Sequence, residues 1–206
     1  MTYKLIIFDM DGTLVQSEDC ASQAMLDVIP GLTGTAQEVT AKYRGMRLAD
    51  IFADIEAVSP GDVPDNCLEL YRDREETLSG SMIVASPEAD QMLSLLSVAK
   101  CIASNAPVEK TLRSLKLCDL SHHFNGGIFS AYQVQAWKPD PTLFEYAAEQ
   151  YGVIAVECLV VEDSVVGIQA AQAAGMAHVY YDLHGNGQAP EGVKSISALG
   201  ELLTMV

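Results

Sequence analysis

Short apolar runs alternate with helical patterns along much of the chain. The first run is Leu5–Phe8, and later runs occur within 100–106, 126–131, 158–164 and 177–182. Helical patterns lie between them at 107–117, 140–153 and 165–176. Continuous rather than alternating apolar runs are typical of parallel strands that are buried on both faces. The pattern therefore predicts an α/β fold, with a doubly wound parallel sheet covered by helices.

The segment from about residue 15 to residue 82 has a different pattern. It contains helical stretches at 17–29, 36–44, 47–57 and 65–78, and no convincing strand. Breaks are expected at Pro30-Gly31, at 59–61 and at Ser79-Gly80. The simplest interpretation is an all-helical insertion after the first strand. We therefore expect a core made of residues 1–15 and 83–206, and a helical domain made of residues 16–82.

Composition limits the class of protein. A chain of 206 residues, 49% of them hydrophobic, can bury one substantial core and a smaller second domain. No apolar run approaches the roughly 20 residues of a membrane helix, and the N-terminus lacks signal-peptide features. Five widely spaced cysteines without a CxxC pair indicate reduced, mostly buried thiols. We expect a cytoplasmic protein with no membrane partner.

The formal net charge of -16 restricts the partners further. Such a charge repels nucleic acid and anionic membrane surfaces, so neither is expected as a partner. A small anionic substrate would need a metal ion or a local cluster of basic residues. Five of the twelve basic residues do fall within 42–74, namely Lys42, Arg44, Arg47, Arg72 and Arg74.

Polar residues follow the predicted strands at the point where each strand ends. These residues are Asp9, Asp11, Ser104, Asn105, Glu162 and Asp163, and Lys138 comes just before a helix. Ligand sites in parallel α/β sheets lie at the carboxyl ends of the strands. We therefore expect these side chains, far apart in sequence, to converge on one site.

Each residue type in this set has a chemical use. Carboxylates from two strands form a hard-oxygen site suited to Mg²⁺. A carboxylate can attack phosphorus to give an aspartyl-phosphate, and a second carboxylate can protonate the leaving oxygen and then activate water. A hydroxyl and an ammonium group can stabilise charge on the transferring phosphoryl oxygens. The set therefore predicts metal-assisted phosphoryl transfer.

The motifs DMDGT, SN, K in WKPDP, and EDS resemble, in this order, those of the haloacid dehalogenase-like hydrolase superfamily. The helical segment resembles the cap of the β-phosphoglucomutase-like phosphatases in this superfamily. Residues 129–148 are also similar to bacterial sugar-phosphate phosphatases of the 6-phosphogluconate phosphatase kind. The resemblance covers nearly the whole chain and implies a Rossmann-like core with a helical cap.

The resemblance also implies a role for each site residue. Asp9 is the expected nucleophile, and Asp11 the expected general acid and base. The transferring phosphoryl group is expected to contact Ser104, Asn105 and Lys138. The expected Mg²⁺ ligands are Asp9, the backbone carbonyl of Asp11, Asp163 and, more indirectly, Glu162. Thr13 is an expected neighbour. His122 and His123 are interpreted instead as surface-loop or helix-cap residues.

The expected activity is Mg²⁺-dependent hydrolysis of a small phosphorylated metabolite, with 6-phosphogluconate as the leading specific candidate. A phosphomutase remains an alternative, although Ala21 stands where the mutases of this subgroup carry a histidine. A non-catalytic phosphometabolite-binding protein or a phosphoacceptor module is an alternative of another class. A monomer is expected.

The basic residues around Gly45 are candidates for substrate specificity. Lys42, Arg44 and Arg47 lie in or beside the predicted loop at 43–48 and could bind a carboxylate or second phosphate of the substrate. Opening and closing of the helical cap would gate substrate entry. We expect the hinges near residues 15–17 and 79–82.

Overall fold

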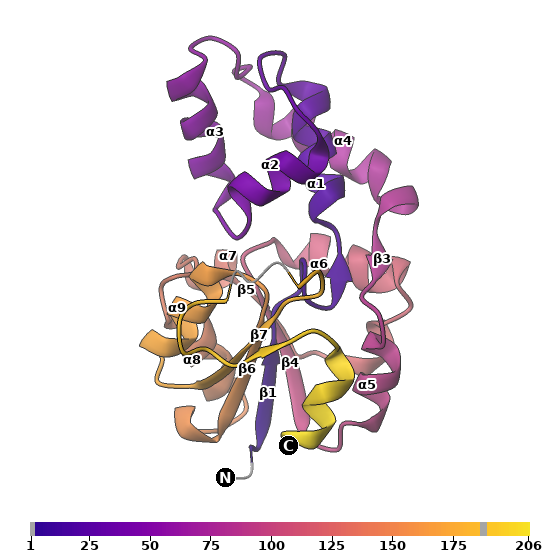
Figure 1. The fold of residues 1–206 in the computed structure, drawn as a ribbon, viewed down its shortest axis with the longest axis vertical. Coiled ribbons are helices and arrows are strands. Elements are labelled where there is room, and N and C mark those ends of the chain that lie inside the picture. Colours follow the sequence, from indigo (N-terminus) through magenta and orange to yellow (C-terminus); the bar gives the residue numbers. More distant parts are fainter. Residues whose placement is uncertain (1–2, 186–188) are drawn as a thin grey trace. The chain divides into compact units, whose positions relative to one another are not determined.

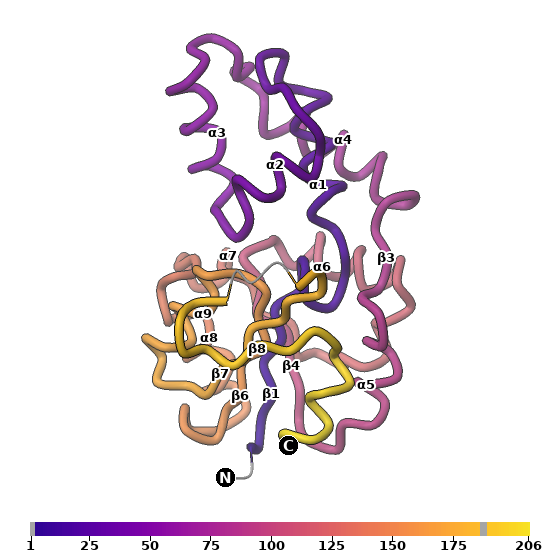
Figure 2. The backbone as a smooth tube through the Cα atoms, in the orientation of Figure 1, coloured from indigo at the N-terminus to yellow at the C-terminus, as the bar shows by residue number. Residues whose placement is uncertain are grey.

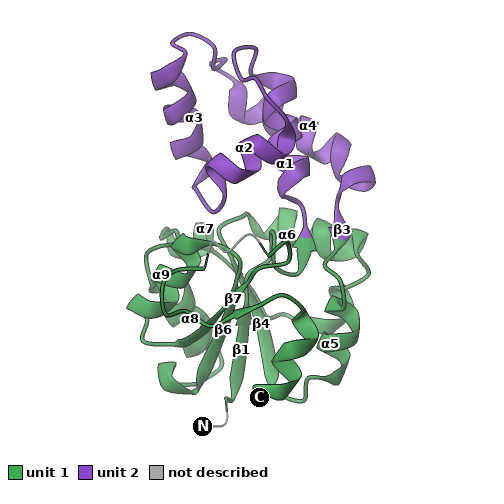
Figure 3. Cartoon of the chain, viewed as in Figure 1, with its two compact units in different colours: residues 1–15, 85–206 green, residues 16–84 purple. Residues whose placement is uncertain are grey.

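The computed structural model describes residues 3–185 and 189–206 (Figure 1). The chain forms two compact units (Figure 3). Residues 1–15 and 85–206 are called the core unit, and residues 16–84 the helical unit. The chain leaves the core unit through β2 (Val15–Gln16) and returns through β3 (Val84–Ala85), and these strands pair with each other. We predicted no strand here, because two residues are too short to produce a recognisable pattern.

The core unit is built on a six-stranded sheet. Its strands are β1 (Leu5–Phe8), β4 (Ala99–Ser104), β5 (Ile128–Ser130), β6 (Cys158–Glu162), β7 (Ala177–Tyr181) and β8 (Ser195–Ile196). They are ordered β5-β4-β1-β6-β7-β8, and every adjacent pair is parallel. The predicted parallel α/β fold is therefore confirmed. The edge strand β8 was not predicted.

Helices connect these strands. The α-helices of the core unit are α5 (Ala89–Leu95), α6 (Val108–Leu117), α7 (Ala131–Val134), α8 (Thr142–Gln150) and α9 (Val165–Ala173). Three 3₁₀ helices are η1 (Ser121–His123), η2 (Ala155–Glu157) and η3 (Leu199–Thr204). The C-terminal segment, yellow in Figure 2, runs from β8 into η3, which packs against α5. Only α6, α8 and α9 were predicted as distinct helices.

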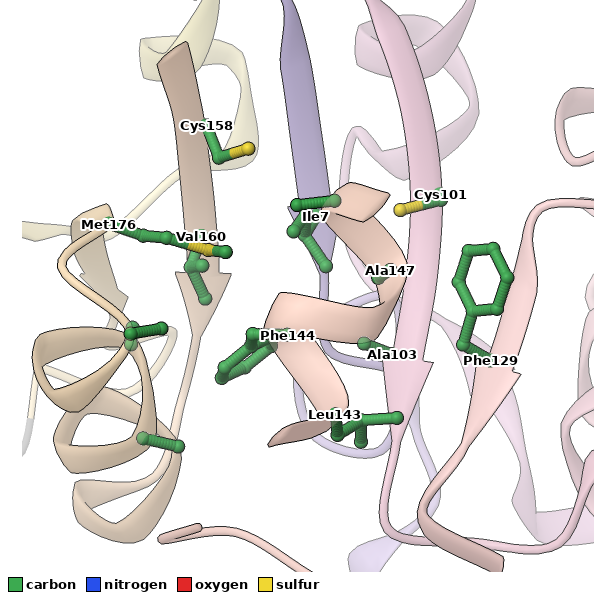
Figure 4. Close-up of a cluster of buried hydrophobic side chains, with 14 of the residues drawn as sticks. Ile7, Cys101, Ala103, Phe129, Leu143, Phe144, Ala147, Cys158, Val160 and Met176 are labelled. Carbon is green, nitrogen blue, oxygen red and sulfur yellow. The ribbon is translucent and has the colours of Figure 1, made fainter. Parts of the chain in front are cut away.

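The central strand β1 shows why the sheet is covered on both faces. Leu5 and Ile7 point to one face, where they join a cluster that includes Leu143 and Phe144 of α8 (Figure 4). Ile6 and Phe8 alternate to the other face and are also fully buried. Burial of each large apolar side chain contributes about 1.5–3 kcal/mol. The uninterrupted apolar run thus fixes β1 in the centre of the sheet, with its polar continuation at one edge.

The helical unit contains four helices with their own apolar core. They are α1 (Glu18–Val28), α2 (Ala36–Tyr43), α3 (Leu48–Val58) and α4 (Cys67–Met82). The buried cluster between them consists of Ala24, Met25, Ile29, Val39, Tyr43, Ile51, Ile55, Cys67 and Tyr71. Thr35 and Glu38 form a capping box that satisfies backbone N–H groups at the start of α2. The predicted all-helical insertion after the first strand is confirmed.

One predicted helix boundary is wrong. We expected a break at Ser79-Gly80, but α4 continues through both residues to Met82. Buried Ser79 donates a hydrogen bond from Oγ to the carbonyl of Glu76, which is compatible with the helix. One helical glycine costs only about 1 kcal/mol relative to alanine. The chain passes between the two units at residues 84–85, and a hinge near residues 79–82 stays a prediction.

Two expectations from composition can also be compared with the structure. All five cysteines are free thiols, and four of them are buried, as predicted. Among the described residues, no helix combines the length and the apolar character needed to cross a membrane.

Candidate active site

The loop after β1 carries the two aspartates of the first motif. Asp9 is buried, and its backbone N–H donates to the carbonyl of Val161 in the neighbouring strand β6. The chain then reverses, because the N–H groups of Leu14 and Val15 both donate to the carbonyl of Met10. This turn holds Asp9 and Asp11 at the carboxyl edge of the sheet.

A buried ion-pair triad joins three separate segments of the chain. Lys138 Nζ lies 2.5 Å from Asp9 Oδ1 and 2.7 Å from Glu162 Oε1. Lys138 is only 5% exposed, and Glu162 is 1% exposed. The parallel register, which pairs Phe8 with Val161, brings Asp9 level with Glu162. The structure therefore brings Asp9, Glu162 and Lys138 together, as predicted from their positions in the α/β pattern.

The surroundings shift the pKa values of Asp9 and Lys138. Desolvation raises the pKa of Asp9 well above its ordinary value, because it outweighs the attraction of Lys138. Burial alone would lower the pKa of Lys138, but the charges of Asp9 and Glu162 raise it above its ordinary value. The two carboxyl groups thus favour the charged form of Lys138, and ionisation of both carboxyl groups would leave an excess of negative charge at the site.

Glu162 is fixed by the start of α9. Its Oε2 accepts hydrogen bonds from the backbone N–H and the hydroxyl of Ser164, each at 2.8 Å. The Ser164 hydroxyl in turn accepts from the N–H of Gly167 and caps the helix. A Cβ added at Gly167 would lie 1.9 Å from Glu162 Cδ. Ser164 and Gly167 were not predicted as site residues, although the serine stands in the motif EDS.

The donors at this edge fit a hard divalent cation. Asp9, Glu162 and Asp163 are buried carboxylates, and the triad contains one buried ammonium group, that of Lys138. A dication would therefore offset excess negative charge, and oxygen ligands are those that Mg²⁺ prefers. Gly12, at φ +86°, keeps the space beside Asp163 open, since a Cβ there would lie 2.2 Å from Asp163 Oδ2. The predicted carboxylate ligands Asp9 and Asp163 thus suit the ion.

Three further residues predicted for the site, Thr13, Ser104 and Asn105, make defined hydrogen bonds. Thr13 is fully buried, and its hydroxyl donates to Asp163 Oδ1 at 3.3 Å. Ser104, also buried, accepts a hydrogen bond from the N–H of Ala106. Asn105 Oδ1 accepts from the backbone N–H of Lys138 at 3.0 Å. Asn105 therefore holds the lysine segment in place, which is a structural role that we did not predict.

The comparison with protein families agrees with these motifs. The haloacid dehalogenase-like hydrolase family matches residues 3–175. The chain belongs to this family. The match spans the motif residues from Asp9 to Asp163, so the resemblance drawn from the motifs is confirmed.

The chain is similar to individual haloacid dehalogenase-like hydrolases in sequence and in structure. It is 34% identical over 180 residues to a 6-phosphogluconate phosphatase of Escherichia coli (strain K12), which covers 85% of this chain and 81% of the relative. It is 31% identical to a fructose-1-phosphate phosphatase of the same strain, over 84% of this chain and 94% of the relative. A haloacid dehalogenase-like protein of unknown function from Agrobacterium tumefaciens strain C58 has a TM-score of 0.84 at 28% identity, covering 98% of this chain and 97% of its own.

A lysine outside the family motifs also reaches the site. Lys110 lies in the first turn of α6, and its Nζ is 3.3 Å from Asp11 Oδ1. Both side chains are partly exposed. We did not predict Lys110 as a site residue. The available signal was its position just after the strand that ends in Ser104, which places it at the carboxyl edge of the sheet.

The predicted specificity residues of the helical unit all form ion pairs within that unit. Lys42 Nζ lies 2.8 Å from Asp54 Oδ2, and Arg47 pairs with Asp50 at 2.9 Å. Arg44 pairs with Glu18 at 3.0 Å, and this pair is the least exposed, at 21% and 19% of the two side chains. Residues 44–47 do form a loop, between α2 and α3. A substrate role for Lys42, Arg44 and Arg47 therefore requires an anion to compete with these carboxylates.

Proposed function

We propose that this chain, a phosphatase of the haloacid dehalogenase-like family, hydrolyses a phosphorylated sugar or sugar acid with the help of Mg²⁺. The leading specific candidate for the substrate is 6-phosphogluconate. One observation carries the proposal above all others: buried Lys138 contacts both Asp9 and Glu162 at the carboxyl edge of the sheet. An aspartate held beside an ammonium group, with Asp11 two residues away, supports a role in phosphoryl transfer to and from oxygen.

In the proposed first step, Asp9 attacks the phosphorus of the ester. The P–O bond to the sugar breaks as the bond to the Asp9 oxygen forms, and Asp11 gives its proton to the leaving oxygen. Lys138 and Ser104 stabilise negative charge on the phosphoryl oxygens. Mg²⁺, held by Asp9, Asp163 and the carbonyl of Asp11, would supply further charge neutralisation.

In the proposed second step, water attacks the phosphorus of the aspartyl-phosphate. Asp11 takes a proton from this water, the bond to Asp9 breaks, and inorganic phosphate leaves. Asp9 and Asp11 thereby return to their starting states. The lysine and serine again stabilise the phosphoryl charge, so one set of residues serves both steps.

The substrate class is inferred from relatives and charge together. Two relatives are named as phosphatases of 6-phosphogluconate and fructose 1-phosphate, which share a phosphate ester on a small polyhydroxylated carbon chain. The first of these substrates also carries a carboxylate. The basic residues of the helical unit, Arg44 in particular, would suit that remote anion.

The test is phosphate release from a panel of 6-phosphogluconate, fructose 1-phosphate, β-glucose 1-phosphate and phosphoglycolate, with Mg²⁺. We expect the highest kcat/KM for a sugar or sugar-acid phosphate, and phosphoenzyme in rapid-quench samples of the native chain but none in Asp9→Asn. Isomerisation of β-glucose 1-phosphate without net phosphate release would identify a mutase instead. Binding without turnover of any panel member would identify a non-catalytic protein.

A further inference from the structure

Two histidines and an aspartate converge at a second place in the core unit. Asp90 lies in the first turn of α5, and His122 and His123 lie in η1. His123 Nε2 is 2.8 Å from Asp90 Oδ1, and His122 Nε2 is 3.6 Å from the same oxygen. The two imidazole rings lie 3.9 Å apart between centroids. One ligand atom of each residue thus falls within 4.8 Å of the other two.

We propose that Asp90, His122 and His123 form a Zn²⁺ site that is separate from the active site. Zn–N and Zn–O bonds of about 2.1 Å in a tetrahedral arrangement place neighbouring ligand atoms about 3.4 Å apart. The two separations from Asp90 Oδ1, 2.8 and 3.6 Å, lie on either side of this value. These two separations are close to those of a tetrahedral Zn²⁺ site, and the ligand atoms of the two histidines lie within 4.8 Å of each other.

The ligand types select the metal. Two imidazole nitrogens and one carboxylate oxygen suit Zn²⁺, whereas Mg²⁺ prefers oxygen ligands throughout. The active-site carboxylates Asp9 and Asp163 offer oxygen ligands only. The two sites therefore differ in ligand chemistry, and the histidine-containing site discriminates against Mg²⁺.

Burial gives the proposed site one fixed side and one open side. The His123 side chain is only 7% exposed and makes an edge contact with Phe124. His122 and Asp90 are 59% and 64% exposed, so an ion can reach them from solvent. His123 is thus a preorganised ligand that costs little conformational entropy to bind, and the open side leaves room for a water ligand. Zn²⁺ would also fasten η1 to α5, which raises the stability of the folded state.

The alternative is an ordinary surface pair between Asp90 and His123 that binds no metal. The two readings differ in what they predict for His122. A simple ion pair needs only His123, whereas a metal site loses a ligand when His122 is replaced. Replacement of exposed His122 removes its ring contact with His123 but keeps the pair between His123 and Asp90, so this variant is the decisive one.

The experiment is isothermal titration of the full chain with Zn²⁺ in excess Mg²⁺, together with thermal unfolding with and without Zn²⁺. Native protein and Asp163→Ala should both bind one Zn²⁺ per chain with a rise in Tm, because the proposed site lies outside the active site. His122→Gln and Asp90→Asn should bind about 100-fold more weakly, since loss of a direct ligand costs at least as much as loss of an outer-shell partner.

His178→Gln is the matched control. His178 lies in β7, where its Nδ1 is 3.0 Å from the carbonyl oxygen of Met176, and its replacement removes one histidine without touching the proposed site. This variant should keep native Zn²⁺ affinity. Unchanged Zn²⁺ affinity in His122→Gln, or loss of all Zn²⁺ binding in Asp163→Ala, would overturn the proposal.

Discussion

Lys138 and Asp9 form a buried ion pair in which Nζ and Oδ1 lie 2.5 Å apart, although 129 residues separate them in sequence. Glu162 shares the same ammonium group, so two buried carboxylates compete for one cation. Without a metal ion, ionisation of both carboxyl groups leaves a buried negative charge that water would solvate better. The groups proposed to react are therefore a source of instability.

The first prediction is that Asp9→Asn stabilises the metal-free protein at neutral pH. The pKa of Asp9 is raised in the folded state, so native protein binds a proton there more tightly than unfolded protein does. Stability from this group is complete below its ordinary pKa of 3.8 and falls as pH rises, by up to about 1.4 kcal/mol per pH unit. Asp9→Asn has no carboxyl group at this position, so its stability does not fall with pH for this reason.

Urea unfolding in EDTA at several pH values measures this effect. The advantage of Asp9→Asn should be absent near pH 4 and grow as pH rises. The exposed residue Asp73 in α4 supplies the control, since Asp73→Asn should show no such trend. Added Mg²⁺ should reduce the advantage by stabilising native protein. An advantage that is independent of pH would contradict the shift assigned to Asp9.

The second prediction concerns metal removal. EDTA should abolish phosphatase activity and Mg²⁺ should restore it, because the proposed ligands include the buried carboxylates of Asp9 and Asp163. Asp163→Ala should weaken Mg²⁺ binding and reduce activity at low Mg²⁺, while Asp73→Ala should change neither. Titration of activity against free Mg²⁺ gives the apparent Mg²⁺ affinity and the maximal activity of each variant. Native Mg²⁺ affinity in Asp163→Ala would show that the ion binds elsewhere.

The third prediction compares two helical glycines. A Cβ at Gly167 in α9 would overlap the carboxyl group of Glu162, so Gly167→Ala should destabilise the protein by about 1–3 kcal/mol. A Cβ at Gly80 in α4 would meet no atom within 4 Å, so Gly80→Ala should stabilise it by up to about 1 kcal/mol. Thermal or urea unfolding of both variants tests the pair, and effects of equal sign would be inconsistent with this structure.

The sequence was sufficient to predict the central sheet and the triad for a physical reason. The continuous apolar run of β1 must be buried on both faces, and its polar continuation then lies where the carboxyl ends of the parallel strands meet. Parallel register brings Asp9 level with Glu162 without further information. Where a strand is buried on both faces, as β1 is, the sequence pattern and the structure agree.

Other features depend on contacts that no local pattern encodes. The helix α4 continues through Gly80 because it packs within the helical unit. The glycine by itself therefore gave a wrong prediction of where the helix ends. Strand β8 is two residues long and has no periodicity to detect. The bond from Lys138 N–H to Asn105 joins segments 33 residues apart, and the approach of Lys110 to Asp11 requires the rotation of α6 to be known.

The fourth prediction assigns Lys110 a positioning role. Its ammonium lies 3.3 Å from Asp11 Oδ1 and can hold this carboxylate in a fixed orientation. Lys110→Met should lower kcat about tenfold, less than the roughly 10²–10⁴-fold expected for loss of acid–base catalysis itself, with little change in KM. Lys110→Arg should recover part of the loss.

Rapid-quench measurement of phosphoenzyme formation and hydrolysis shows where the loss occurs. Both steps should slow in Lys110→Met, because Asp11 acts in both. Lys116→Met is the control, since Lys116 lies on the same helix but is exposed at its last turn. A rise in KM at unchanged kcat would assign Lys110 to substrate binding rather than to positioning.

The fifth prediction concerns the ion pair between Arg44 and Glu18 in the helical unit. If the loop at 43–48 contacts the substrate, its remote anion must compete with Glu18 for Arg44. Arg44→Ala should then raise KM for an anionic sugar phosphate about tenfold or more, since hydrogen bonds to charged groups are worth about 1.5–3 kcal/mol. Glu18→Gln should lower this KM, because it removes the competing negative charge.

A generic phosphate ester without a remote anion separates specificity from general damage, since its KM should respond much less to either variant. Arg47 pairs with Asp50 in a more exposed position, so Arg47→Ala should have a smaller effect on both substrates. Arg74→Ala, which breaks a pair with Asp27 elsewhere in the helical unit, is the matched control. Equal losses on both substrates in Arg44→Ala, with no gain in Glu18→Gln, would mean that this ion pair only stabilises the helical unit.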